Sequence, residues 1–276
     1  MRARMAQHSP YPTIARARHP LEAATDETEL VIDGFPRTGT TFAVVAFHLA
    51  QHGLVRVSHH IHSAAHLLAA SRRATPTLGI IREPRDTAVS CVIREPYVTL
   101  RQALWAYAVF YTALNELGDR VVVGDFGDIT TDIGGVIDRV NDRFGTSFAR
   151  FVNTPHTTAE CFRIIDDRAR RPPWDDHIGA FLAGTEDIHQ LRRARQEWQA
   201  HHPDPLPIPE DRVARPSQSR QRTKARLRRN YASAELAATR TRAEHAYTRF
   251  LRAARRTQAV LVAIGLSTEW CRLVPG

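Results

Sequence analysis

The sequence predicts an α/β protein, with a central parallel sheet flanked by helices in three layers and a long helix near the C-terminus. The first observation is a set of three short apolar runs, each typical of a buried strand: 29–33, 77–81 and 120–123. The second observation is that a helix-length segment follows each run: 40–51, 86–93 and 132–144. Strands that alternate with helices are typical of a parallel sheet covered on both faces.

The elements around the first two strands have clear local signals. Residues 29–33 (ELVID) end at Gly34, where a glycine-rich turn leads into a strongly apolar segment. Residues 77–81 (TLGII) lead into a short helix that has Pro84 in its first turn. Proline suits this position because the backbone N–H that it lacks would have no partner within the helix there. A long helix rich in aromatic residues is predicted at 100–117. Strand, turn and helix therefore repeat along the first half of the chain.

The two ends of the chain are more polar than its middle. Residues 1–28 form a polar N-terminal arm, and 29–276 form one domain. Within that domain, 201–219 contains several prolines and few apolar residues, which predicts a loop or lid. The following segment, 220–256, is predicted to be a continuous basic helix.

Composition restricts the partners and the compartment. The net charge of +9 over 276 residues favours anionic partners, which include nucleic acid, anionic lipid and nucleotides. The three cysteines are isolated in the sequence, which is typical of a reducing compartment. No apolar segment follows the basic N-terminus, and no stretch approaches the ~18 apolar residues of a membrane span. We therefore expect a cytoplasmic protein without a membrane span.

The first motif is the loop at residues 34–41, which reads GFPRTGTT. Gly34 and Gly39 have the spacing of a Walker A loop, in which a turn before a helix presents backbone N–H groups to phosphate. The lysine of such a loop should follow Gly39, but Thr40 stands there and the cation is at Arg37 instead. An ATPase or GTPase would lose a phosphate ligand by this change, so the loop is predicted to bind another anion.

Residues 36–41 resemble the 5′-phosphosulfate loop of sulfotransferases that use 3′-phosphoadenosine-5′-phosphosulfate (PAPS), and they fit its pattern at every position. The resemblance is closest to a divergent bacterial branch, and it implies a P-loop-type fold with PAPS as co-substrate and no metal ion. It also implies a catalytic role for Arg37, which would meet the charge on the moving sulfuryl group. The residues implied to bind the 5′-phosphosulfate are Pro36, Arg37, Thr38, Gly39, Thr40 and Thr41.

The second motif is at residues 82–90, which read REPRDTAVS. Arg82 leaves the end of a predicted strand, and Ser90 lies in the helix that follows. Both can reach one phosphate at the carboxyl edge of the sheet, where open α/β sheets bind ligands. The order of residues resembles the 3′-phosphate signature of the same family, which implies that Arg82 and Ser90 bind that phosphate. The alternative is a surface arginine beside a helix cap.

A cluster of histidines lies between the two motifs, and it consists of His59, His60, His62 and His66. Sulfuryl transfer to a hydroxyl requires the loss of a proton, and histidine titrates near neutral pH. The family's spacing from its 3′-phosphate arginine implies that His60 is the base, with His59 as its competitor. The cluster is otherwise a polar loop, or a metal site built from His60, His62 and His66.

The predicted function is sulfuryl transfer from PAPS to a hydroxyl or amine of a small-molecule or carbohydrate acceptor. The resemblance covers residues 29 to about 150, and residues 216–224 are the candidate replacement for the family's missing late adenosine-binding segment. One alternative is a P-loop small-molecule kinase, for which Asp125 at a strand end would bind magnesium. Another is a non-catalytic nucleotide- or nucleic-acid-binding protein that uses the basic 220–256 segment. Few aromatic residues accompany the cations of that segment, which disfavours nucleic acid as the partner. The sequence does not indicate an oligomeric state.

Overall fold

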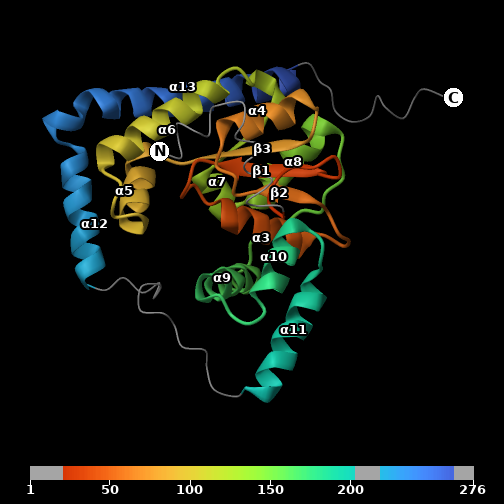
Figure 1. Ribbon diagram of the computed structural model, residues 1–276. Coiled ribbons are helices and arrows are strands. Elements are labelled where there is room, and N and C mark those ends of the chain that lie inside the picture. The colour runs from red at the N-terminus through yellow and green to blue at the C-terminus, as the bar shows by residue number, and fades with distance from the viewer. Residues whose placement is uncertain (1–20, 203–217, 264–276) are drawn as a thin grey trace, which may run out of the picture.

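The computed structural model describes residues 21–202 and 218–263, and it confirms an α/β fold with a parallel sheet (Figure 1). The four strands are hydrogen-bonded in the order β2-β1-β3-β4, and every pairing is parallel. Their bounds are β1 Leu30–Gly34, β2 Val57–His59, β3 Thr77–Ile81 and β4 Val122–Asp125. All the strand ends that carry predicted site residues therefore lie at one edge of the sheet.

The sheet separates two hydrophobic cores. Val31 of β1 packs into one core, whereas its neighbours Leu30 and Ile32 pack into the other, because successive side chains of a strand point to opposite faces. All five residues of β1 and all five of β3 are buried. A strand that is covered on both faces reads as a continuous apolar run, which is why β1 and β3 were predictable from the sequence.

Helices cover both faces of the sheet, as Figure 1 shows. One face is covered by α4 Ala64–Arg72, α5 Pro84–Arg94, α6 Leu100–Leu114, α12 Gln218–Tyr231 and α13 Ala237–Ala263. The opposite face is covered by α3 Thr40–Ala50, α7 Phe126–Thr131, α8 Ile133–Phe144, α9 Pro155–Arg170, α10 Asp175–Ala183 and α11 Ile188–His201. The predicted three-layer arrangement is thus observed in the described residues.

Several elements differ from the sequence prediction. β2 and α4 were not predicted, because β2 is only three residues long and α4, which is rich in Ala and Leu, begins beside the histidine cluster. The third predicted strand begins two residues later, since residues 118–120 form a short 3-10 helix. The single basic helix predicted at 220–256 is wrong: α12 ends at Tyr231, and α13 begins at Ala237 in a new direction.

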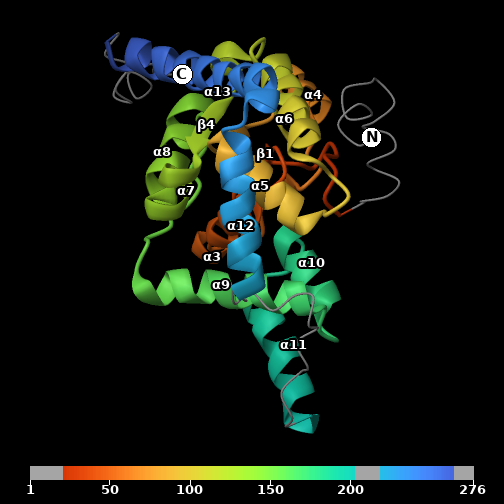
Figure 2. The ribbon, with the colours of Figure 1, turned by 90° about the vertical axis from the view of Figure 1, so that its left-hand side faces the viewer.

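The break between α12 and α13 is held by Arg240, whose guanidinium donates to the carbonyl oxygens of Tyr231 (2.6 Å) and Ser233 (3.4 Å). As a result α13 packs along α6, whereas α12 turns back across α5, in front of the sheet edge in Figure 2. Residues 1–20 of the predicted arm and residues 203–217 of the predicted lid lie outside the described residues. Among the helices that the structure describes, none combines the length and apolarity needed to cross a membrane.

Candidate functional site

The turn at residues 34–41 connects β1 to α3 and depends on two glycines. A Cβ atom on Gly34 would lie 2.3 Å from the carbonyl oxygen of Ile80, so no other residue fits beside β3. Gly39 has a φ of +101°, a conformation that glycine adopts without strain, and it is the residue before the first turn of α3. The first N–H groups of a helix have no partner within the helix. The turn therefore directs backbone donors to the carboxyl edge of the sheet.

The three threonines of this turn have different environments. Thr38 is buried and its hydroxyl donates to the carbonyl oxygen of Phe35 (2.7 Å), so this side chain shapes the turn. The hydroxyl of Thr40 is buried and has no hydrogen-bond partner among the described residues. The hydroxyl of Thr41 lies 2.8 Å from Nε2 of His60. A buried hydroxyl without a partner is costly, so Thr40 is a candidate donor to a bound ligand.

The two sequence motifs meet in space. Arg37 has a φ of +73° and its Nε donates to the hydroxyl of Ser90 (3.1 Å), 53 residues further along the chain. Arg82 donates to the carbonyl oxygen of Arg37 at the longer distance of 3.4 Å. Pro36 is joined to the same helix, because its carbonyl oxygen accepts from the thiol of Cys91 (3.5 Å). The predicted 5′- and 3′-phosphate residues therefore form one continuous surface.

Arg82 is oriented by aromatic residues that were not predicted to contribute to the site. Its guanidinium lies over the ring of Phe126, 3.9 Å from the centroid. Its own carbonyl oxygen accepts from the hydroxyl of Tyr107 (2.7 Å), and Tyr111 donates to Ile80 at the end of β3 (2.7 Å). These contacts fix the end of β3. One face of the Arg82 guanidinium lies on Phe126, and its Nη1 edge points toward the carbonyl oxygen of Arg37.

Positive charge is concentrated around the turn. Loss of solvent around the guanidinium, and then the charges of Arg94, Arg220 and Arg82, lower the pKa of Arg37 from its ordinary value. Guanidinium groups remain charged in proteins, so this crowding is an electrostatic cost and not a loss of charge. An anion placed among these arginines would relieve that cost.

His60 hydrogen bonds through both ring nitrogens. Its Nε2 meets the hydroxyl of Thr41, and its Nδ1 lies 2.7 Å from Nδ1 of His59, so only one of the two Nδ1 atoms carries a proton. Desolvation, and then the neighbouring histidines, lower the pKa of His60 well below its ordinary value. Burial lowers the pKa of His59 to about 3, and its Nε2 has no partner among the described residues. The structure thus places the predicted base against the predicted anion loop.

His62 is attached to the beginning of the same turn by Asp33, which is fully buried at the end of β1. The backbone N–H of His62 donates to Oδ2 of Asp33 (2.8 Å), and its Nδ1 lies 3.2 Å from Oδ1. Nδ1 also donates to the carbonyl oxygen of Gly34 (2.7 Å). Desolvation would lower the pKa of His62, but Asp33 outweighs that effect and raises the pKa above its ordinary value.

The histidines do not converge in the way that the metal alternative requires. In the part of the chain that the structure describes, no group of three or more His, Cys, Asp or Glu side chains could hold a metal ion. Nε2 of His66 lies 2.9 Å from the hydroxyl of Ser58.

Both carboxylate oxygens of Asp125 accept hydrogen bonds within the protein. Oδ1 accepts from the N–H of Gly127 (2.9 Å), and Oδ2 accepts from the hydroxyl of Tyr247 (2.9 Å).

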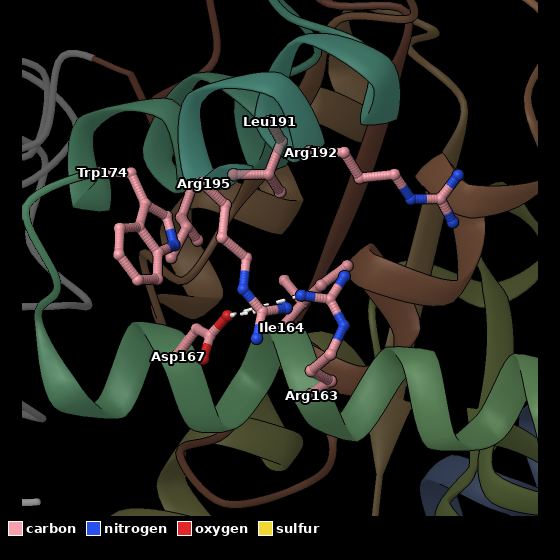
Figure 3. Close-up of a pocket in the computed structure, with 8 residues that line it drawn as sticks. Arg163, Ile164, Asp167, Trp174, Leu191, Arg192 and Arg195 are labelled. Carbon is pink, nitrogen blue, oxygen red and sulfur yellow. Dashed lines mark hydrogen bonds and ion pairs between the residues drawn. The ribbon is translucent and has the colours of Figure 1, made fainter. Parts of the chain in front are cut away.

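A separate small pocket lies between α9, α10 and α11 (Figure 3). Its lining combines apolar residues with one carboxylate, Asp167, which pairs with Arg163 (3.5 Å) and with Arg195 (3.6 Å). Burial raises the pKa of Asp167. The pocket contains no residue of the two motifs, so it is not part of the candidate site.

The sequence pointed to the loop, Arg82, Ser90 and the histidines, and Arg220 lies within the candidate segment 216–224. The sequence did not point to Asp33 or Phe126. Asp33 looked like the last residue of a strand, and Phe126 lies far from the motifs in the sequence. Comparison of the chain with models of protein families, with curated proteins and with solved structures finds no match. The function is therefore argued from the site alone.

Proposed function

We propose that this chain is a PAPS-dependent sulfotransferase. The observation that supports it most strongly is the contact of two phosphate-type motifs, with Arg37 hydrogen-bonded to Ser90 and Arg82 reaching the carbonyl oxygen of Arg37. ATP and GTP, the usual ligands of a P-loop, carry phosphates only at the 5′ position. PAPS carries anionic groups at both the 3′ and the 5′ positions. Two adjacent cationic subsites that share one edge of a sheet suit such a ligand.

Each residue of the site has a role in this proposal. The backbone N–H groups at the start of α3, with Thr40 and Thr41, bind the 5′-phosphosulfate, and Arg37 stabilises the charge that develops on the moving sulfuryl group. Arg82 and Ser90 bind the 3′-phosphate, since a guanidinium fork matches phosphate geometry. Transfer to a hydroxyl or amine of a small-molecule or carbohydrate acceptor leaves adenosine 3′,5′-bisphosphate. A histidine beside the turn accepts the acceptor's proton, and the sequence predicts His60 for this role.

The kinase alternative has less support from the described residues. Thr40 occupies the position of the phosphate-binding lysine, and the carboxylate of Asp125 already accepts two hydrogen bonds. The nucleic-acid alternative depends on the basic segment 220–256, in which Tyr231 and Phe250 are buried. Tyr247 of the same segment is half-buried and its hydroxyl donates to Asp125, so none of these rings is fully exposed for base stacking.

Calorimetric titration distinguishes these functions. We expect adenosine 3′,5′-bisphosphate to bind without added magnesium and more tightly than ATP, because only the bisphosphate engages both Arg37 and Arg82. Tight binding of ATP that requires magnesium would support the kinase instead. Absence of binding to either nucleotide, combined with strongly salt-dependent binding of an oligonucleotide, would support the nucleic-acid alternative.

A further inference from the structure

His62 and Asp33 form a pair that the nucleotide-binding roles leave unexplained. Asp33 is fully buried, yet its two carboxylate oxygens are both directed by specific donors: the N–H of Gly34 (2.8 Å) and the N–H of His62 (2.8 Å). The His62 ring is then held through Nδ1, between Asp33 and the carbonyl oxygen of Gly34. The backbone of His62 has a φ of +52°, which is unusual for a residue with a side chain. Such strain is found where the surroundings fix a residue for a purpose.

The contacts of His62 define its tautomer. Because Nδ1 faces two oxygen acceptors, it must carry the proton, and Nε2 of the neutral ring is left with a free electron pair. His60 differs, since both of its ring nitrogens are already engaged with Thr41 and His59. The two rings are close, with centroids 5.6 Å apart, and His62 remains about one-quarter exposed. His62 is therefore the ring of this pair with a basic nitrogen available beside the turn.

We infer that His62, oriented by Asp33, is the residue that accepts the proton of the acceptor, an inference that rests on the proposed sulfuryl transfer. In that step the acceptor oxygen forms a new bond to sulfur, and the bond between sulfur and the 5′-phosphate oxygen breaks. The electron pair of the broken bond stays on the phosphate oxygen of the bisphosphate product. The acceptor proton moves to Nε2 of His62, and the carboxylate of Asp33 stabilises the imidazolium that results.

His60 then has a different role, as a positioning residue for Thr41. When Thr41 donates its hydroxyl hydrogen to a bound anion, its oxygen must accept from Nε2 of His60 at 2.8 Å. Nδ1 of His60 then accepts from Nδ1 of His59, so both histidines are fixed as neutral rings. A ring that donates to Thr41 through Nε2 cannot also take a proton there.

The charged groups around His62 determine the expected pH dependence. Asp33 from β1 contacts it directly, the charge of Arg37 in the turn lowers its pKa, and His60 is its neighbour. The charge of His66 in α4 acts on Asp33. Because the pKa of His62 is raised above its ordinary value, the neutral, active ring needs a higher pH than an ordinary histidine does. The rate should rise with pH through that raised pKa, and Asp33→Asn should move the rise to lower pH.

The experiment compares His62→Gln, Asp33→Asn and His60→Gln in the full chain. Transfer from PAPS is measured with an aliphatic alcohol as acceptor and, without it, as sulfate release to water. Calorimetry with adenosine 3′,5′-bisphosphate is run on each variant. The matched control is His177→Gln, which removes another histidine paired with a carboxylate, 2.8 Å from Glu186.

We expect His62→Gln to lower kcat by about 10²–10⁴-fold with little change in bisphosphate affinity. His60→Gln should weaken bisphosphate binding and lower kcat by less than about 10-fold. Full activity of His62→Gln would overturn the inference, and so would an unchanged pH profile in Asp33→Asn. A wild type that binds the bisphosphate but transfers to neither alcohol nor water would also overturn it. Failure of the wild type to bind the bisphosphate would instead refute the proposed function.

Discussion

Replacement of Arg82 by alanine tests the proposed division between the two phosphate subsites. Among the described residues, the guanidinium of Arg82 makes one long hydrogen bond, 3.4 Å to the carbonyl oxygen of Arg37, and it lies 3.9 Å from the centroid of the Phe126 ring. Its remaining donors are therefore available to a ligand. If they bind the 3′-phosphate, Arg82→Ala should remove charge-assisted hydrogen bonds that contribute about 1.5–3 kcal/mol. That loss corresponds to roughly 10- to 150-fold in Kd for adenosine 3′,5′-bisphosphate.

The assay is calorimetric titration with two nucleotides that differ at the 3′ position. Adenosine 5′-phosphosulfate lacks the 3′-phosphate, so its affinity for Arg82→Ala should stay close to that for the wild type. Arg82→Lys keeps the charge but loses the fork and the stacking on Phe126, and it should recover only part of the affinity. Arg85→Ala is the matched control, because Arg85 is paired with Glu83 (3.6 Å) and Asp86 (3.6 Å). Equal losses for the two nucleotides, or a similar loss in Arg85→Ala, would refute the assignment of Arg82.

Two further predictions concern the scaffold. Gly34→Ala should lower the free energy of unfolding by about 3 kcal/mol, because the new Cβ would lie 2.3 Å from the carbonyl oxygen of Ile80. Urea unfolding measures this loss. The control is Gly53→Ala, which should show no such loss because the space around Gly53 is open. Burial lowers the pKa of His48 to about 4, below its unfolded value, so its contribution to stability is complete above about pH 6.5 and is lost as the pH falls toward 4. The slope should be about 1.4 kcal/mol per pH unit, and urea unfolding of His48→Gln should show a correspondingly shallower pH dependence, whereas an unchanged slope would contradict the assignment.

The parts of the fold that could be predicted from the sequence are those whose signals are local. β3 was predicted with its observed bounds, because all five of its residues are buried. Leu78 and Ile80 pack in one apolar core and Ile81 packs in the other. The turn before α3 was predicted because Gly34 and Gly39 are needed for close approach and for a positive φ. The position of Arg82 and Ser90 at the carboxyl edge of the sheet was predicted from the parallel strands, whose carboxyl ends share one edge. The direct hydrogen bond between Arg37 and Ser90 was not predicted.

The parts that could not be predicted depend on contacts between distant residues. No local pattern distinguishes Asp33 from an ordinary acidic residue at the end of a strand. His62 reaches Asp33 only because the chain returns to the sheet through β2. The turn between α12 and α13 is stabilised by Arg240, which one helical pattern across 220–256 could not reveal. Arg228 contacts Asp86 across 142 residues, so the position of α12 had no local signal.

The docking of α12 also connects the fold to the proposed ligand. Apolar contacts of Leu227 and Tyr231 and the 2.8 Å ion pair between Arg228 and Asp86 hold α12 against α5. Repulsion between Arg220 of α12 and Arg37 of the turn opposes that position. An anion bound at the turn would remove the repulsion without weakening either attraction. Binding of the anion and docking of α12 must then stabilise each other by the same free energy, since coupling between two equilibria is reciprocal.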